Sequence, residues 1–171
     1  MNELTSIASQ FHILAKEALA LLLGMAIGLN RQIAGKPAGV RTQMLVAGAA
    51  CLVITLGPVM ANSYMMFKGM DLVRLDTVGL VSSIITGIGF IGAGTIIYHR
   101  KENMVEGLTT AATLLFSAFI GIATGLEQYI VAIGSTIMVV LILVVFNRLD
   151  KYLNNKLIKR FSHEDSETRN I

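Results

Sequence analysis

The stretch GIGFIGAG, residues 87–94, decides how this chain is interpreted, because it fits two incompatible structures. Gly87, Gly89 and Gly92 match the dinucleotide-binding pattern G-x-G-x-x-G, which needs a preceding strand in a soluble βαβ unit. The same glycines lie inside residues 77–98, an apolar run without a charged side chain. About 20 such residues cross a bilayer as one helix, and glycine there lets a neighbouring helix approach closely. We therefore interpret the stretch, Gly94 included, as part of a membrane helix with a packing face.

The composition of the whole chain agrees with a membrane protein. Hydrophobic residues make up 54% of its 171 residues and charged residues 15%, against about 25% charged residues in soluble domains. The mean hydropathy is +0.67. We expect an all-α fold, a polytopic membrane helix bundle. The net charge is +3, and its basic residues flank the apolar runs, where they contact lipid headgroups. The expected partner is therefore the lipid bilayer and not a nucleic acid.

The apolar runs predict five membrane spans, at residues 11–29, 42–60, 77–98, 108–126 and 128–146. Their orientation follows from the distribution of Lys and Arg. The loops after the first and third spans and the C-terminal segment hold eleven of these residues, whereas the opposite side holds Lys68 and Arg74. The N-terminus is then outside and the C-terminus cytoplasmic, in a multi-pass membrane protein.

We expect a transmembrane domain over residues 1–147 and a short basic cytoplasmic tail over residues 148–171. Residues 150–161, DKYLNNKLIKRF, fit either a basic helix on the inner leaflet or a continuation of the fifth helix. Residues 162–171 are expected to be disordered. Residues 1–10 lack the charged leader of a secretory signal, so the first span is expected to be retained.

Small residues at four-residue spacing predict close helix contacts in other spans too. In the first span this pattern is a G-x-x-x-G step, and in the fourth it is a longer stripe. The predicted packing positions outside the 87–94 stretch are Gly24, Gly28, Ser117, Gly121 and Gly125. They indicate a compact bundle or a seam between two copies and say nothing about chemistry.

Lys16 and Glu17 are charged residues inside the first apolar run. An ionised side chain at mid-bilayer costs at least about 2.5 kcal/mol, and adjacent helical residues do not face each other. Two interpretations stay open. The side chains extend to the outer headgroups, or they line a polar cavity that opens to the outside.

The loop between the first two spans begins with Asn30 and Arg31. Its sequence predicts an ordered turn and not a flexible linker. Pro37 and Gly39 fit a turn in the sequence KPAG, residues 36–39. Thr42 is the expected cap of the next helix. Three cations, Arg31, Lys36 and Arg41, suit an acidic partner or lipid phosphates, or they only fix the orientation in the membrane.

The second basic loop ends in EGLTT, residues 106–110. Glu106 brings a negative charge to the start of the fourth helix, Gly107 follows it, and Thr109 or Thr110 is the expected cap. These residues are fully explained as the start of a helix, without any further role. A cross-loop ion pair between Glu106 and Arg41 is the functional alternative.

The sequence offers no set of catalytic residues, so we expect no enzyme activity, no metal site and no cofactor. The histidines at positions 12, 99 and 163 lack ligand-like spacing to acidic residues, and no G-x-S-x-G or Walker pattern occurs. Cys51 is the only cysteine, which excludes an intrachain disulfide. Few polar residues suit a pore lining.

Three segments together resemble the MgtC/SapB family of bacterial inner-membrane proteins. They are LLLGMAIGLNRQIAGKPAGVRTQMLV (21–46), GIGFIGAGTII (87–97) and VEGLTTAATLLFSAFIGIATG (105–125), and the resemblance extends over about residues 14–145. Asn30 departs from the family pattern, which commonly reads G-L-E-R here. The best-studied members also carry a soluble domain after the last helix, so the chain is similar to a form with the membrane domain alone.

The resemblance implies five membrane helices and a non-enzymatic regulator linked to magnesium homeostasis, acid tolerance and the survival of pathogens inside cells. Its implied partners are other membrane proteins, such as a magnesium-transporting ATPase or ATP synthase, and a homo-oligomer is a further expectation. The alternative is a small-ion transporter or channel for magnesium or protons. Its path would lie near Lys16, Glu17, Thr109 and Thr110.

Overall fold

A computed structural model describes residues 7–68, 76–99 and 104–168, with side chains for residues 7–61, 76–96 and 105–149. The elements are α1 (Ile7–Ile33), α2 (Val40–Lys68), α3 (Thr77–Gly94), β1 (Ile97–His99), β2 (Met104–Glu106), α4 (Leu108–Gly125) and α5 (Tyr129–Thr168). All five helices are long and apolar enough to cross a membrane. A helix satisfies its own backbone polar groups, as lipid requires. The five predicted spans are confirmed.

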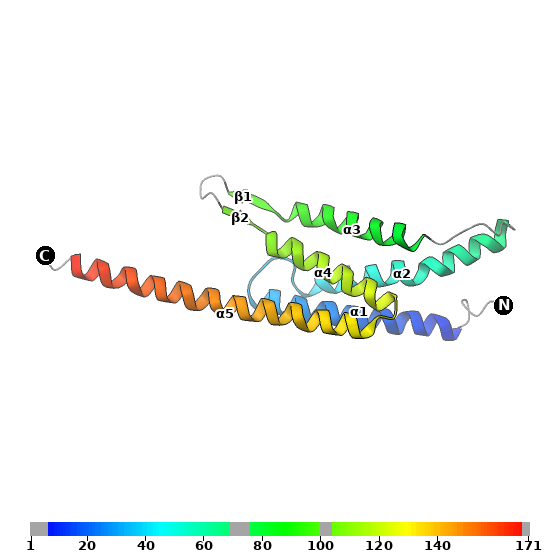
Figure 1. Cartoon of the computed structure of the whole chain (residues 1–171), viewed down its shortest axis with the longest axis horizontal. Coiled ribbons are helices and arrows are strands. Elements are labelled where there is room, and N and C mark those ends of the chain that lie inside the picture. The colour runs from blue at the N-terminus through cyan, green and yellow to red at the C-terminus, as the bar shows by residue number, and fades with distance from the viewer. Residues whose placement is uncertain (1–6, 69–75, 100–103, 169–171) are drawn as a thin grey trace.

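Helix α4 lies at the centre of the bundle and contacts each of the other four helices (Figure 1). α1 and α2 make the most extensive contact with each other. The loop 34–39 and the β1–β2 hairpin lie at one end of the bundle, which we call the basic end. The turn 126–128 between α4 and α5 lies at the other end, which we call the Glu127 end.

The buried core forms where α4 meets its neighbours. One cluster joins α1, α4 and α5, a second joins α2 and α4 with α3 packed against it, and a third joins α1 and α2. The buried members of the first cluster are Ile27, Ile120, Ala132 and Val139, those of the second are Ala50, Ile54, Ala118 and Ile122, and those of the third are Ala20, Ala47 and Cys51. Small residues dominate, so the helices approach closely and pack without a large aromatic residue.

Glycines mark the closest helix approaches. A Cβ added at Gly24 would lie 2.5 Å from the Gln43 carbonyl oxygen, and one at Gly28 would lie 2.5 Å from the Val40 Cα. At Gly125 the nearest atom would be the Ile54 Cβ, at 2.9 Å. These positions hold α1 and α4 against α2, and a side chain at any of them requires the backbones to separate.

The glycines of the 87–94 stretch pack differently from the expectation. Gly92 is buried and faces Ala111 of α4, whereas a Cβ at Gly87, Gly89 or Gly94 would meet nothing within 4 Å. Helix α3 is the least buried of the five spans. Within one chain, only Gly92 of these four glycines is at a close helix contact. The reason is that only one side of α3 faces α4.

The third span ends earlier than predicted. The helix stops at Gly94, and the apolar residues up to position 98 enter β1, which pairs antiparallel with β2 through Tyr98 and Val105. Gly107 closes this excursion with a φ of 90°, where an added Cβ would lie 2.8 Å from the Thr95 carbonyl carbon. Apolar content alone does not distinguish a short strand from another helical turn, which explains the incorrect boundary.

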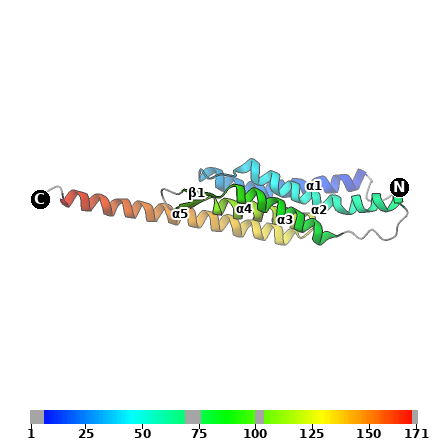
Figure 2. The same ribbon diagram turned by 90° about the horizontal axis from the view of Figure 1, so that it is seen from above.

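Helix α5 continues far beyond the membrane span and projects from the bundle at the basic end (Figures 1 and 2). The predicted boundary between residues 147 and 148 lies inside this helix, so the C-terminal segment continues α5. Residues 162–168, expected to be disordered, are helical. The sequence from 135 to 168 has no Gly or Pro, so nothing breaks the helix there.

Candidate functional site

A buried hydrogen-bond network lies toward the basic end between α2 and α4. The Gln43 side chain is fully buried, and its Nε2 donates to the Thr113 Oγ1 at 3.0 Å and to the Ala38 carbonyl oxygen at 3.2 Å. The Ser117 hydroxyl donates to the Gln43 Oε1 at 2.6 Å. Every polar atom of the amide thus has a partner, as a polar group in an apolar environment requires.

Arg31 connects the same region to α1. The side chain is only 4% exposed, and its Nη2 donates to the Pro37 carbonyl oxygen at 3.3 Å and to the Thr110 hydroxyl. Its Nε is buried without a hydrogen-bond partner. A guanidinium normally uses its five donors, so this side chain is incompletely satisfied.

The loop 34–39 places its backbone toward these side chains. Gly35 and Ala38 have φ values of 66° and 54°, and the chain bends at Pro37 and Ala38, within the predicted turn 36–39. The Gln32 Oε1 accepts a 3.4 Å hydrogen bond from the Val40 amide at the start of α2. Thr42 is therefore not the cap of this helix, because α2 begins two residues earlier than predicted.

The prediction that Thr109 or Thr110 caps α4 is also wrong. Gly107 occupies the N-cap position and makes no side-chain hydrogen bond there. Thr110 instead bonds to Arg31, and Thr109 lies on the wall of a neighbouring cavity. The helix can begin without a side-chain cap because Gly107 supplies the left-handed backbone of the turn.

That cavity, of about 400 Å³, brings together four of the predicted site residues at the basic end. Asn30, Arg31, Lys36 and Thr109 line it from α1, the loop and α4. Its remaining wall consists of Ala34 and four residues of α5, namely Ile142, Leu143, Phe146 and Asn147. The wall carries two cations and no acidic residue.

Arg41 and Thr42 lie elsewhere, on an apolar groove of about 480 Å³ between α2 and α3 that also includes Gly87. The three cations of the loop thus do not form one site, because Arg31 faces α4 and Arg41 faces the groove. The ion pair between Arg41 and Glu106 stays a prediction.

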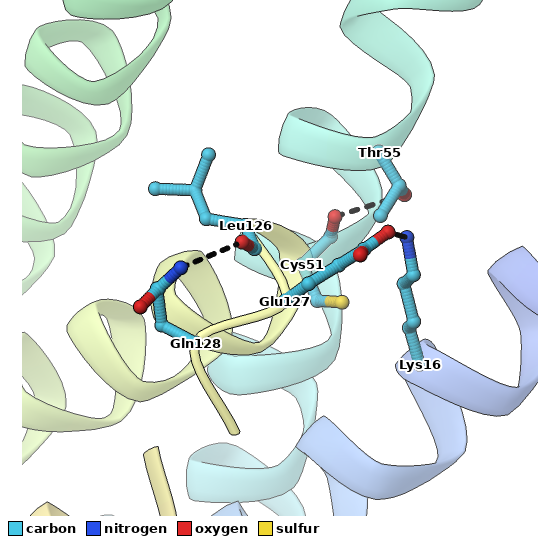
Figure 3. A network of polar contacts seen from close by, with 6 residues as sticks. All are labelled: Lys16, Cys51, Thr55, Leu126, Glu127 and Gln128. Carbon is cyan, nitrogen blue, oxygen red and sulfur yellow. Dashed lines mark hydrogen bonds and ion pairs between the residues drawn. The ribbon is translucent and has the colours of Figure 1, made fainter. Parts of the chain in front are cut away.

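Lys16 has a partner that the sequence did not indicate. Its Nζ lies 2.6 Å from the Glu127 Oε1, at the Glu127 end of the bundle (Figure 3). The Lys16 side chain is 12% exposed and that of Glu127 is 58% exposed. The hydrogen bond and the charge of Lys16 lower the pKa of Glu127. Both residues line a cavity of about 530 Å³ together with His12, whereas Glu17 is half-buried and not part of its wall.

No metal centre is evident at either end. Within the residues whose side chains are described, no group of three or more His, Cys, Asp or Glu side chains lies close enough to hold a metal ion. The basic-end cavity presents cations, amides and a hydroxyl, a set suited to an anion.

Sequence reasoning missed Gln43, Glu127 and Asn147, and it assigned Thr113 only to the small-residue packing stripe of the fourth span. One signal was available for Gln43, an amide inside an apolar run, where a polar side chain must find a hydrogen-bond partner in a neighbouring helix. Glu127 was considered only as the break between two spans.

Comparison with known proteins adds to this geometry. The model of the MgtC family matches residues 18–152. The chain belongs to the MgtC family. It is a multi-pass protein of the bacterial inner membrane, with five helices long enough to span it.

Three curated relatives illustrate the match. Protein SapB of Bacillus subtilis is 38% identical over 129 residues, which cover 75% of this chain and 54% of the relative. The putative magnesium transporter YhiD of Escherichia coli K12 is 40% identical over 139 residues, which cover 81% of this chain and 62% of the relative. Protein MgtC of Salmonella typhimurium is 41% identical over 122 residues, which cover 70% of this chain and 46% of the relative. The chain thus spans about half to two thirds of these relatives' length. No solved structure matches it.

The MgtC-family match includes the basic-end cavity and the buried network around Gln43. Lys16 and Glu17 lie before the first matched residue, 18. Glu127 lies inside the match, so the family model extends over both ends of the bundle.

Proposed function

We propose that this chain is a non-enzymatic regulator that acts on partner membrane proteins in bacterial magnesium homeostasis, with a role in acid or stress tolerance. Family membership and the printed name of the Escherichia coli relative, putative magnesium transporter, support the link to magnesium. The basic end faces the cytoplasm in this proposal, as its excess of Lys and Arg favours.

The observation that carries the proposal is the closed interior of the bundle. The two end cavities are lined by Lys16 and by Arg31, which lie about 22 Å apart along α1. Between them the described side chains form the alanine-rich and isoleucine-rich core, and Gln43, Thr113 and Ser117 satisfy one another. An ion path needs a continuous series of polar groups, and this core favours a regulator over a pore.

The contact surface that we propose for partners is the outer side of α3. Gly89 and Gly94 have open space beside them, and Phe90 is 82% exposed. Glycines that face away from their own bundle allow the backbone of another helix to approach. The partner is a magnesium-transporting ATPase or ATP synthase, as the family resemblance implies, or a second copy of the chain.

A flux measurement separates the regulator from a transporter. Purified protein is reconstituted into liposomes that contain a magnesium-sensitive or pH-sensitive dye, and an imposed ion gradient is followed over time. We expect the dye signal to change no faster than in protein-free liposomes. Substantial flux of magnesium or protons by the chain alone would refute the proposal.

A second measurement tests the partner contact. The chain is reconstituted together with a purified magnesium-transporting ATPase or with ATP synthase, and ATP hydrolysis is measured with and without it. Wild-type protein should change the rate, and Gly89→Leu should abolish this change because the leucine blocks close approach. Gly134→Leu, at a glycine of α5 that also has open space beside it, is the matched control and should behave like wild type. An effect of wild type that Gly89→Leu leaves intact would reject α3 as the contact.

The alternative function is a small-ion transporter, supported by the cavity at Lys16 and Glu127 and by the name of the Escherichia coli relative. Its path would have to pass between copies of the chain. In that case Glu127→Gln should alter the liposome flux, and unchanged flux would count against this path.

A further inference from the structure

Arg31 is a buried cation, and none of the side chains that the structure describes gives it a counter-charge. Its guanidinium bonds only to a carbonyl oxygen and a hydroxyl, both neutral, and its Nε has no partner. Among the residues whose side chains are described, no carboxylate forms an ion pair with Arg31 within 4.0 Å. A buried charge is costly unless an opposite charge compensates it.

The cavity beside Arg31 has the composition of an anion site. Lys36 adds a second cation at its rim, and Asn30, Asn147 and Thr109 add neutral donors. No acidic residue lines the wall. An anion inside would therefore gain two charge interactions and would meet no repulsion from the wall.

We propose that this cavity binds a phosphate group. The planar guanidinium with its fork of donors matches phosphate oxygens, and a nearby lysine adds a point charge. A volume of about 400 Å³ falls within the usual range of ligand pockets, about 300–1,000 Å³, so the phosphate carries a further chemical group. Ile142, Leu143 and Phe146 form an apolar wall for that group.

Two sources share this chemistry. An anionic phospholipid would place its phosphate at Arg31 and its glycerol and first acyl carbons against the α5 wall. A soluble phosphorylated compound would enter from the aqueous side of the basic end. The site serves a regulator or a transporter equally, so it stands independently of the function proposed above.

The test uses the full chain in nanodiscs of phosphatidylcholine. Its thermal unfolding midpoint is measured by circular dichroism while inorganic phosphate is added, with chloride at the same ionic strength as the reference. A second arm replaces part of the lipid with phosphatidylglycerol and omits phosphate. We expect one or both anions to raise the midpoint above its reference. A response to phosphate indicates a soluble ligand, and a response to phosphatidylglycerol alone indicates a lipid.

Three variants connect the response to the cavity. Asn30→Asp places a carboxylate on the wall of the cavity that Arg31 and Lys36 line, so its midpoint in the reference should equal or exceed that of wild type, and its anion affinity should fall roughly tenfold or more. Lys36→Gln changes an exposed residue and should weaken binding without harming the fold. Arg41→Gln removes an exposed cation outside the cavity and should respond like wild type.

Two results would overturn the proposal. One is a midpoint that neither phosphate nor phosphatidylglycerol raises above its reference. The other is a response that Asn30→Asp and Lys36→Gln retain at full size, or that Arg41→Gln loses as strongly as they do, because the anion would then bind to basic groups outside the cavity.

Discussion

Replacing Gly121 with alanine should separate the two most buried helices of the bundle. The added Cβ would lie 2.9 Å from the Ala47 carbonyl carbon and 3.0 Å from the Ala50 Cβ, and closer still to the Ala47 carbonyl oxygen. Ordinary contact begins at 3.4 Å, so α2 and α4 must move apart by at least about 0.5 Å. Overpacking costs typically 1–3 kcal/mol, and here the obstructing atoms include backbone. Allowing for the better helix propensity of alanine, we expect a net loss of about 2 kcal/mol.

The native Cys51 gives a direct assay of this separation. It is the only cysteine, and it is fully buried where α1 meets α2. Maleimide labelling of the folded protein then reports transient opening, and a loss of about 2 kcal/mol raises its rate about 30-fold. A titration with denaturing detergent, followed by circular dichroism, measures the stability itself.

Gly134→Ala is the matched control, because a Cβ at Gly134 meets nothing within 4 Å. It should leave the labelling rate of Cys51 unchanged and stabilise the helix by up to about 1 kcal/mol. The reasoning would be refuted if Gly121→Ala were as stable as Gly134→Ala and labelled no faster. The α2–α4 contact would then tolerate a methyl group that the structure leaves no room for.

Three further outcomes are expected. Gln43→Leu leaves the Ser117 hydroxyl without its acceptor and should lower the free energy of unfolding by about 1–3 kcal/mol in the same detergent titration; an unchanged value would contradict the network. Because Lys16 lowers the pKa of Glu127 in the folded protein, their pairing stabilises the fold above the ordinary Glu pKa of about 4.3 and is lost as the pH falls through the lowered value. The thermal midpoint of wild type should therefore fall more steeply with acidification below about pH 4.3 than that of Glu127→Gln, and parallel profiles would exclude the pair. Gly107→Ala forces a side chain into left-handed backbone against the end of α3, so its midpoint should drop by several degrees, which circular dichroism will detect.

The membrane spans could be predicted because their cause is local. About 20 apolar residues satisfy the length of a bilayer wherever they occur, and charged flanks limit them. The same local rule misplaced the end of α3, where residues 95–98 are apolar and yet belong to a turn and a strand. Apolar content predicts burial in lipid or protein, but not the backbone conformation of a short segment.

Which residues meet could not be predicted, because contacts depend on how the helices are rotated. Gly87 and Gly92 belong to one motif, yet only Gly92 faces α4. Lys16 and Glu127 are 111 positions apart, and only the placement of α1 beside the α4–α5 turn brings them together. The cations of the first loop looked like one group, and the fold separates Arg31 from Arg41.

The continuity of α5 gives the bundle a lever arm. Phe146 and Asn147 lie on the wall of the phosphate cavity, and the same helix continues to Thr168, about 30 Å farther along its axis. A tilt of roughly 5° at the wall would displace the far end by about 3 Å. The helix also fixes an angular register, since each inserted residue would rotate everything beyond it by about 100°. Occupancy of the cavity would thereby be converted into a change of position well away from the membrane.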